Sequence, residues 1–256
     1  MPRYDERALV LDVAPFRESS SLVRVFTEHE GRISLVARGL RSSKNNSSAA
    51  AMQPFNVVRI RFSLKDGATL GNLTTAEIEQ TAQAPHQSVE AYALISYWFE
   101  ILKETSQERV TMAGVFQLTM QMLEIQHKAP GLTTDYLNAL LILCRELGFG
   151  MSLNRCVECG QPPDISSAAP VYLSVPRGGI VCESCHQSQH VAALRLTRDE
   201  ISAIAALAPD HPAPDKTDPA TAGRFLVLTL VNRFLVNHLE HPLRSFRFIQ
   251  DVIGKA

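Results

Sequence analysis

The chain has 256 residues, of which 45% are hydrophobic, so it can bury a substantial core in one or two domains. Its formal net charge of −1 argues against a uniformly basic nucleic-acid-binding protein. No apolar run reaches the length of a membrane span, and the charged N-terminus has no apolar signal segment. The sequence therefore predicts a soluble, cytoplasmic protein with no membrane association.

The first 80 residues contain short β-branched runs that are typical of strands. Five strands are expected, at residues 8–13, 21–27, 32–38, 57–64 and 68–75. In the fourth, strict alternation should put the side chains of Val58, Ile60, Phe62 and Leu64 on one face and those of Val57, Arg59, Arg61 and Ser63 on the other. Five strands with no long helix among them predict a small closed barrel of the OB type.

Basic charge is concentrated between residues 31 and 65, which include no acidic residue. The basic residues there are Arg32, Arg38, Arg41, Lys44, Arg59, Arg61 and Lys65. A phosphate backbone requires several cations along one groove, so the segment predicts a nucleic-acid-binding surface, with a solvated strand face as the alternative. Phe16, Phe26 and Phe55 could stack on bases, although each alone is more often a core residue. The polar segment 41–51 is expected to be a mobile loop.

After Pro85 the apolar period changes from 2 to 3.6, which predicts a helical region. Its first three helices are expected at residues 89–102, 110–125 and 132–147. Thr197-Arg-Asp-Glu200 has the form of a capping box at the start of another helix. Asp218-Pro219 predicts the N-terminus of a long final helix, and Pro242 should end or bend it.

Four of the five cysteines form two C-x-x-C pairs, Cys156-Val-Glu-Cys159 and Cys182-Glu-Ser-Cys185, separated by 22 residues. This spacing predicts one zinc ion held by four thiolates, a closed and therefore structural site. Disulfides and a redox motif are the alternatives, and His186 or His190 could replace a cysteine as a ligand. Cys144 lies in an apolar run and is expected to be a small buried residue.

Catalytic motifs are missing from the sequence. It contains no phosphate-binding loop, nucleophile elbow, H-E-x-x-H motif or D-x-D cluster, so no enzymatic activity is predicted. An NAD-dependent deacetylase with a zinc ribbon would need a glycine-rich dinucleotide loop, which is missing as well. A translation or transcription factor with an OB fold and a zinc ribbon, which would prefer structured RNA, is the stronger alternative.

Several short motifs occur along the chain in one order, at residues 8–19, 25–31, 37–41, 53–55, 147–149, 178–185 and 242–245. In this order they resemble the bacterial recombination mediator family RecO. The resemblance implies an α+β multidomain protein with an OB-fold barrel at 1–80 and a helical domain at 81–256. It also implies a four-cysteine zinc finger inserted at about 154–190, in which one zinc braces the domain.

The resemblance further implies a non-enzymatic DNA repair protein, associated with the nucleoid, that binds single- and double-stranded DNA and anneals complementary strands. With RecR, such a protein helps to load RecA onto DNA coated by the single-strand-binding protein SSB. The acidic C-terminal tail of SSB would dock on the helical domain. Its terminal carboxylate would be received by one of three arginines beside the apolar final helix, Arg224, Arg233 or Arg244.

Overall fold

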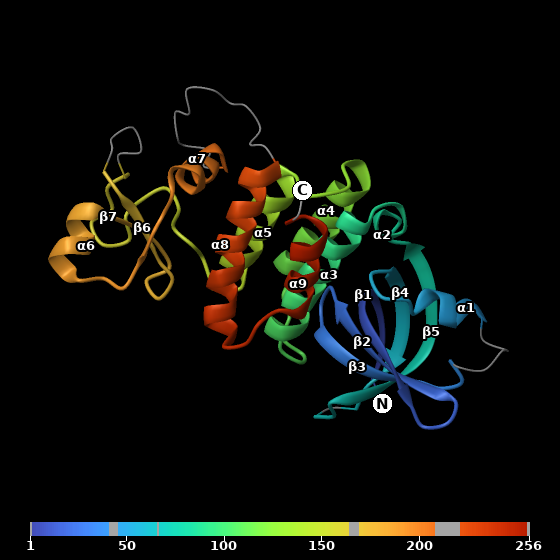
Figure 1. Ribbon diagram of the computed structural model, residues 1–256. Coiled ribbons are helices and arrows are strands. Elements are labelled where there is room, and N and C mark those ends of the chain that lie inside the picture. The colour runs from blue at the N-terminus through green and yellow to red at the C-terminus, as the bar shows by residue number, and fades with distance from the viewer. Residues whose placement is uncertain (1, 41–45, 66, 164–168, 208–220, 255–256) are drawn as a thin grey trace. The chain divides into compact units, whose positions relative to one another are not determined.

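The computed structural model describes residues 2–40, 46–65, 67–163, 169–207 and 221–254 (Figure 1). The chain divides into two compact units, each described below by itself. The first contains Met1–Gln87 and Trp98–His127, and the second contains Ser88–Tyr97 and Lys128–Ala256. Helical segments beyond residue 80 thus contribute to both units, and the division into domains 1–80 and 81–256 stays a prediction.

The five predicted strands form a closed barrel in the order β1-β2-β3-β5-β4, which confirms the expected OB-like architecture (Figure 1). The strands are β1 (Arg3–Phe16), β2 (Ser20–Thr27), β3 (Gly31–Ala37), β4 (Val57–Ser63) and β5 (Leu70–Gln80). β3 and β5 pair in parallel, and the other neighbours are antiparallel. β1 is the longest because it pairs with β4 through its first half and with β2 through its second.

The barrel interior is filled by alternate residues of the strands, as the period of two predicts. Ile60 and Phe62 of β4 belong to this interior cluster. Val57 lies on the other face of β4, with Arg59 and Arg61, but it is fully buried, and so is its register partner Leu9. Neither residue belongs to the interior cluster, so this part of the wall is covered from outside. Helices of the same unit supply such cover elsewhere on the wall, where the Phe26 ring packs 6.2 Å from a ring of α4.

Residues 46–51 correct the prediction of a mobile loop at 41–51. Asn46–Ala51 forms a short helix, α1, whose last residue is buried in the barrel interior together with Met52. The Asn56 side-chain amide donates hydrogen bonds to the Ala50 and Ala51 carbonyl oxygens and so satisfies the end of the helix. The polar composition of the segment gave no indication that Ala51 and Met52 would be buried. Residues 41–45 lie outside the part of the chain that the structure describes.

The predicted helices are present in the described residues, some with shifted ends. They are α3 (Val89–Thr105), α4 (Ala113–Lys128), α5 (Thr134–Glu146), α7 (Arg198–Leu207) and α8 (Thr221–Leu239). Two further helices, α2 (Ala84–Gln87) and α9 (Arg244–Val252), were not predicted. The capping box is confirmed, because the Thr197 amide donates to Glu200 and the Glu200 amide donates to the Thr197 hydroxyl. α8 ends ahead of Pro242, whereas Asp218-Pro219 lies outside the described residues.

Each of the two units contains a hydrogen bond between buried side chains. The Trp98 indole donates to the Thr119 hydroxyl at 3.0 Å, and the Tyr97 hydroxyl donates to Asn232 at 3.2 Å. These pairs avoid the cost of a buried donor without an acceptor. Among the described helices, none has the length and apolar character needed to cross a membrane.

Candidate metal centre and nucleic-acid interface

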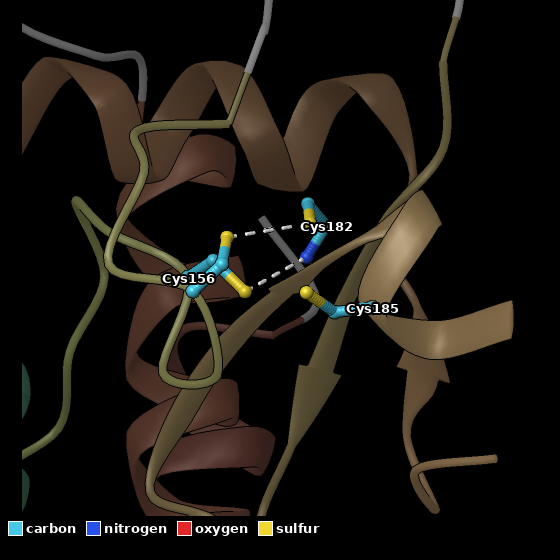
Figure 2. Close-up of side chains that lie close together, drawn as sticks. Cys156, Cys182 and Cys185 are labelled. Carbon is cyan, nitrogen blue, oxygen red and sulfur yellow. Dashed lines mark hydrogen bonds between the residues drawn. The ribbon is translucent and has the colours of Figure 1, made fainter. Parts of the chain in front are cut away.

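A small sheet and a short helix carry the second C-x-x-C pair, Cys182 and Cys185, and a turn outside these elements carries the first pair, Cys156 and Cys159. The sheet has the order β7-β6-β8, with β6 at Val171–Ser174, β7 at Gly179–Cys182 and β8 at Leu194–Arg195. The helix, α6 (Glu183–Gln189), follows β7 directly. The sulfur atoms of Cys156, Cys159, Cys182 and Cys185 all lie within 4.8 Å of one another. Figure 2 shows three of these cysteines with their sulfurs facing a common point.

The first pair sits in a tight backbone turn. The Gly160 amide donates to the Cys156 carbonyl at 2.8 Å, and Gly160 has a φ of +72°, which a residue with a side chain rarely adopts. The Val157 amide donates to the Ile180 carbonyl and so ties this turn to β7. Gly179 is required at this contact, because an added Cβ would lie 2.3 Å from the Ser152 carbonyl oxygen. Both glycine positions therefore serve to hold the two pairs together.

The second pair is positioned by the start of α6. Cys182 is the N-cap residue, and Cys185 lies in the first helical turn. The Cys182 amide points at the Cys156 sulfur, with 3.4 Å between nitrogen and sulfur. The Cys159 and Cys182 sulfurs are 3.8 Å apart. A tetrahedral ion with metal–sulfur bonds of about 2.3 Å places its sulfurs about 3.8 Å apart. The four cysteines therefore fit one tetrahedral metal ion with no open position.

The thiols perturb one another strongly. Burial raises the pKa of the Cys182 thiol, but hydrogen bonds with Ser184 and with the Cys185 backbone outweigh it and lower the pKa to about 6. The pKa of Cys185 is raised to about 12, first by its hydrogen bond with Cys182 and then by burial. A bound metal ion would remove this competition, because the cysteines would hold it as thiolates and release their protons.

The other candidate ligands lie apart from the sulfur cluster. His186 stacks on Tyr172 with ring centroids 3.8 Å apart, and its Nδ1 lies 3.0 Å from the Val191 carbonyl oxygen. His190 ends α6 in a left-handed conformation, and the described metal-ligating cluster contains cysteines alone. Cys144 is fully buried, and burial raises its pKa to about 12, so it is a core residue as expected and not a nucleophile.

The structure separates the predicted phosphate-binding residues into groups. Arg59 and Arg61 point outward from β4 and are exposed, as are Arg38 and Lys65. Arg32 is half-buried, and its guanidinium donates to the Lys103 carbonyl near the end of α3 at 2.8 Å. Arg32 is therefore engaged in holding that helix against the barrel. The remaining two predicted residues, Arg41 and Lys44, lie outside the described part of the chain.

Acidic residues of neighbouring strands flank the exposed arginines of β4. The Asp5 carboxylate of β1 accepts hydrogen bonds from both Arg59 and Arg61. Arg7, also on β1, forms an ion pair of 2.6 Å with Glu79 of β5. The acid-free stretch in the sequence thus becomes a mixed surface in the barrel. Pairing of β1 with β4 places Asp5 opposite Arg61. In the sequence, the alternation of Arg3, Asp5 and Arg7 was the feature that could have indicated that these charged side chains share one face of β1.

The three candidate stacking rings differ in accessibility. Phe26 is fully buried against α4, so the core alternative is the correct one for it. Phe55 is half-buried and meets Phe99 edge to face, with centroids 5.0 Å apart. Phe16 is half-buried beside Arg17, whose guanidinium lies 5.3 Å from the ring centroid. Of the three, the last two retain accessible ring surface in the barrel unit.

The three arginines proposed for a carboxylate are not brought together along α8. Nine residues, or about two and a half turns, separate Arg224 from Arg233, so they leave the helix on opposite sides. Arg224 is half-buried, whereas Arg233 is exposed. Arg244 begins α9, one turn before the exposed Phe248. It therefore shares a face of α9 with an exposed aromatic ring, which the other two arginines do not.

That aromatic ring belongs to an exposed apolar surface that the sequence reasoning missed. Phe248 meets Tyr92 of α3 edge to face, with centroids 6.1 Å apart, and Val89 lies one turn before Tyr92. All three side chains are exposed, by 38% to 61%. They belong to the second compact unit. The periodicity of α3 placed Val89 and Tyr92 on a helix, whereas α9 was not predicted, and only the packing identifies which rings stay at the surface.

Comparison with known proteins matches both parts of the chain to one family. A family model described as Recombination protein O N terminal matches residues 1–82, and one described as Recombination protein O C terminal matches residues 86–247. The relatives named DNA repair protein RecO include one from Desulforudis audaxviator, 26% identical over 98% of each chain. Another, from Bifidobacterium longum subsp. infantis, is 28% identical over 98% of this chain and 100% of its own. A third, from Syntrophomonas wolfei, is 29% identical over 78% of this chain and 77% of its own. The chain belongs to the recombination protein O (RecO) family of DNA repair proteins.

Proposed function

We propose that this protein is a recombination mediator that binds single- and double-stranded DNA on its barrel and anneals complementary strands without acting as an enzyme. The match of both RecO family models along nearly the whole chain carries the proposal. The closed barrel supports it, because small barrels of this kind bind single strands through cations and accessible rings. Arg38, Arg59, Arg61 and Lys65 are the exposed cations that we assign to DNA phosphates, with Arg41 and Lys44 of the connecting segment.

The proposed mechanism is electrostatic. Phosphates of one strand would lie along the arginines of β4, and the second strand would be held nearby while its charge is partly neutralised. Two polyanions repel each other before they pair, so cations between them lower the barrier to pairing. Phe16 and Phe55 offer ring surface for bases, whereas Phe26 is unsuitable because it is buried.

We assign zinc to the four-cysteine site, with Cys156, Cys159, Cys182 and Cys185 as its ligands. Four thiolates in a tetrahedral arrangement suit Zn²⁺, because its filled d shell imposes no other geometry and because it binds thiolate sulfur well. When bound, the zinc ion would cross-link the finger. It would not act in catalysis, because a closed four-thiolate site leaves no position for water. The hydrogen bonds between the first turn and β7 would then hold the finger as one body.

The proposed partners are RecR, with which the protein would help RecA to replace SSB, and the SSB tail itself. An acidic tail that ends in an aromatic residue and a carboxylate needs an apolar surface beside a cation. Arg244 and the surface formed by Val89, Tyr92 and Phe248 combine these features on α3 and α9. We therefore favour Arg244 over Arg224 and Arg233 as the residue that receives the terminal carboxylate.

Arg244→Glu is expected to weaken binding of an SSB-tail peptide by at least about tenfold, because it places a negative charge where the carboxylate would dock. Annealing of SSB-coated strands should fall with it, whereas annealing of bare strands should be retained. Fluorescence anisotropy of a labelled peptide measures the first effect. Arg233→Glu, on the exposed side of α8, is the matched control and should retain peptide binding. Equal losses on bare and coated strands would instead assign Arg244 to the DNA surface or to folding.

The function as a whole is tested by adding the wild-type protein to complementary oligonucleotides, bare or coated with SSB, in the absence of nucleotide. The proposal expects faster annealing on both substrates, with a rate that falls as salt rises. The affinity for structured RNA, measured at the same salt concentration, is compared with the affinity for single-stranded DNA. Tighter binding to that RNA than to single-stranded DNA, without annealing, would support an RNA-binding factor and overturn the proposal.

A further inference from the structure

Asp5 lies between two arginines on the surface of the barrel. Its Oδ1 accepts a hydrogen bond from Arg59 Nε and its Oδ2 accepts one from Arg61 Nε at 3.1 Å, so one carboxylate bridges two arginines. Strand pairing fixes this arrangement, because Asp5 of β1 lies directly opposite Arg61 of β4 in register. The carboxylate is therefore presented to the arginines by the sheet and not by a flexible loop.

A carboxylate in this position occupies the place that a phosphate would take. Guanidinium groups bind carboxylates and phosphates through the same charge-assisted hydrogen bonds. Asp5, Arg59 and Arg61 are all at least two-fifths exposed, so solvent and other anions reach the pair. Hydrogen bonds from Arg59 and then from Arg61 lower the pKa of the Asp5 carboxyl, which keeps it charged well below neutral pH.

We propose that Asp5 is a resident competitor for DNA phosphate, which holds Arg59 and Arg61 in a binding pose and is displaced when a strand binds. This inference rests on the proposed DNA-binding function of the same surface. It makes the affinity of the barrel for DNA weaker than its arginines alone would give. A protein that pairs two strands also has to release the product, and a competing anion built into the surface speeds that release.

The measurable consequence concerns both affinity and its salt dependence. Asp5→Asn keeps the shape of the side chain and removes its charge, so a phosphate no longer has to break the existing ion pairs. Binding of a labelled thymidine homopolymer should tighten by about three- to tenfold at low salt, and the log–log salt slope should steepen by up to roughly 0.7. Asp5→Thr, a better strand former, should give the same result if asparagine disturbs β1.

The same substitution in an Arg59→Gln/Arg61→Gln background provides the decisive comparison. A direct competitor can act only through the arginines that it occupies, so the gain from Asp5→Asn should vanish there. Two matched variants remove one negative charge elsewhere. Asp12→Asn breaks a carboxylate that pairs with Arg24 and Lys103, and Glu146→Gln changes an exposed residue of α5. Neither should tighten binding as Asp5→Asn does.

The three ways in which the test can fail are distinguishable. If Arg59→Gln/Arg61→Gln weakens binding but Asp5→Asn leaves it unchanged, the DNA surface stands and the competitor role of Asp5 is wrong. If Asp5→Asn tightens binding equally without the two arginines, or if Glu146→Gln does the same, the effect reflects net charge and the inference also fails. If the arginine variant binds as the wild type does, the proposed DNA surface itself is wrong and the inference fails with it.

Discussion

Replacing Cys156 by serine is expected to release the bound metal and to destabilise the protein. Cys156 is almost fully buried, and the apolar cluster around it contains only three other buried residues among those described, Val181, Cys185 and Val191. So small a core cannot hold the finger without a cross-link. A loss of about 3 kcal/mol, the scale for a structural cross-link, lowers the thermal midpoint of a chain of this size by about 6–12 °C.

Elemental analysis of protein purified without added metal measures this effect directly, and the wild type should contain about one zinc per chain. Cys144→Ser is the matched control, because Cys144 is the one cysteine outside the cluster. That variant should lose some stability, since it places a hydroxyl in an apolar core, but it should retain zinc. A normal zinc content after all four ligand cysteines are changed to serine would refute the assignment of the site.

Reversing the charge of Arg59 and Arg61 together should weaken single-stranded DNA binding by at least about tenfold at low salt. Both side chains are exposed on β4, and Glu77 and Glu79 of β5 lie on the neighbouring strand. The Arg59→Glu/Arg61→Glu variant therefore converts a mixed surface into an acidic one. The log–log salt slope should also flatten by roughly 0.7 for each phosphate that the variant no longer binds.

Anisotropy titrations of one labelled oligonucleotide at several salt concentrations give both quantities. Arg145→Glu/Arg198→Glu makes the same change in net charge at exposed positions in the second compact unit, and it should bind nearly as the wild type does. Unchanged affinity and slope in the folded Arg59→Glu/Arg61→Glu variant would show that DNA follows another path.

Local patterns in the sequence were sufficient for the barrel and the metal site. Alternation in β4 placed Ile60 and Phe62 on one face, which lies inside the barrel, and the two C-x-x-C spacings identified the four clustered cysteines. Both predictions depend on residues close together in the chain. The alternation of side chains along a strand and the two-residue spacing within a C-x-x-C pair are both set by the local sequence.

Other features depend on pairing between distant segments, which the sequence pattern does not contain. Asp5 meets Arg59 and Arg61 only because β1 pairs with β4 in one register, so the acid-free stretch suggested a more basic surface than the barrel has. Arg32 was counted among the phosphate-binding cations, although it binds the Lys103 carbonyl of a helix that follows the barrel in sequence. Burial of Val57 has the same origin, because cover from outside the barrel cannot be read from alternation.

If the arginines of β4 bring complementary strands together, annealing should depend on them. The annealing rate of bare complementary oligonucleotides can be measured with the wild type and with the Arg59→Glu/Arg61→Glu variant, both at low salt. The wild type should accelerate annealing, and the folded variant should leave the rate close to that of strands without protein. Full acceleration by the variant would instead show that annealing does not depend on this surface.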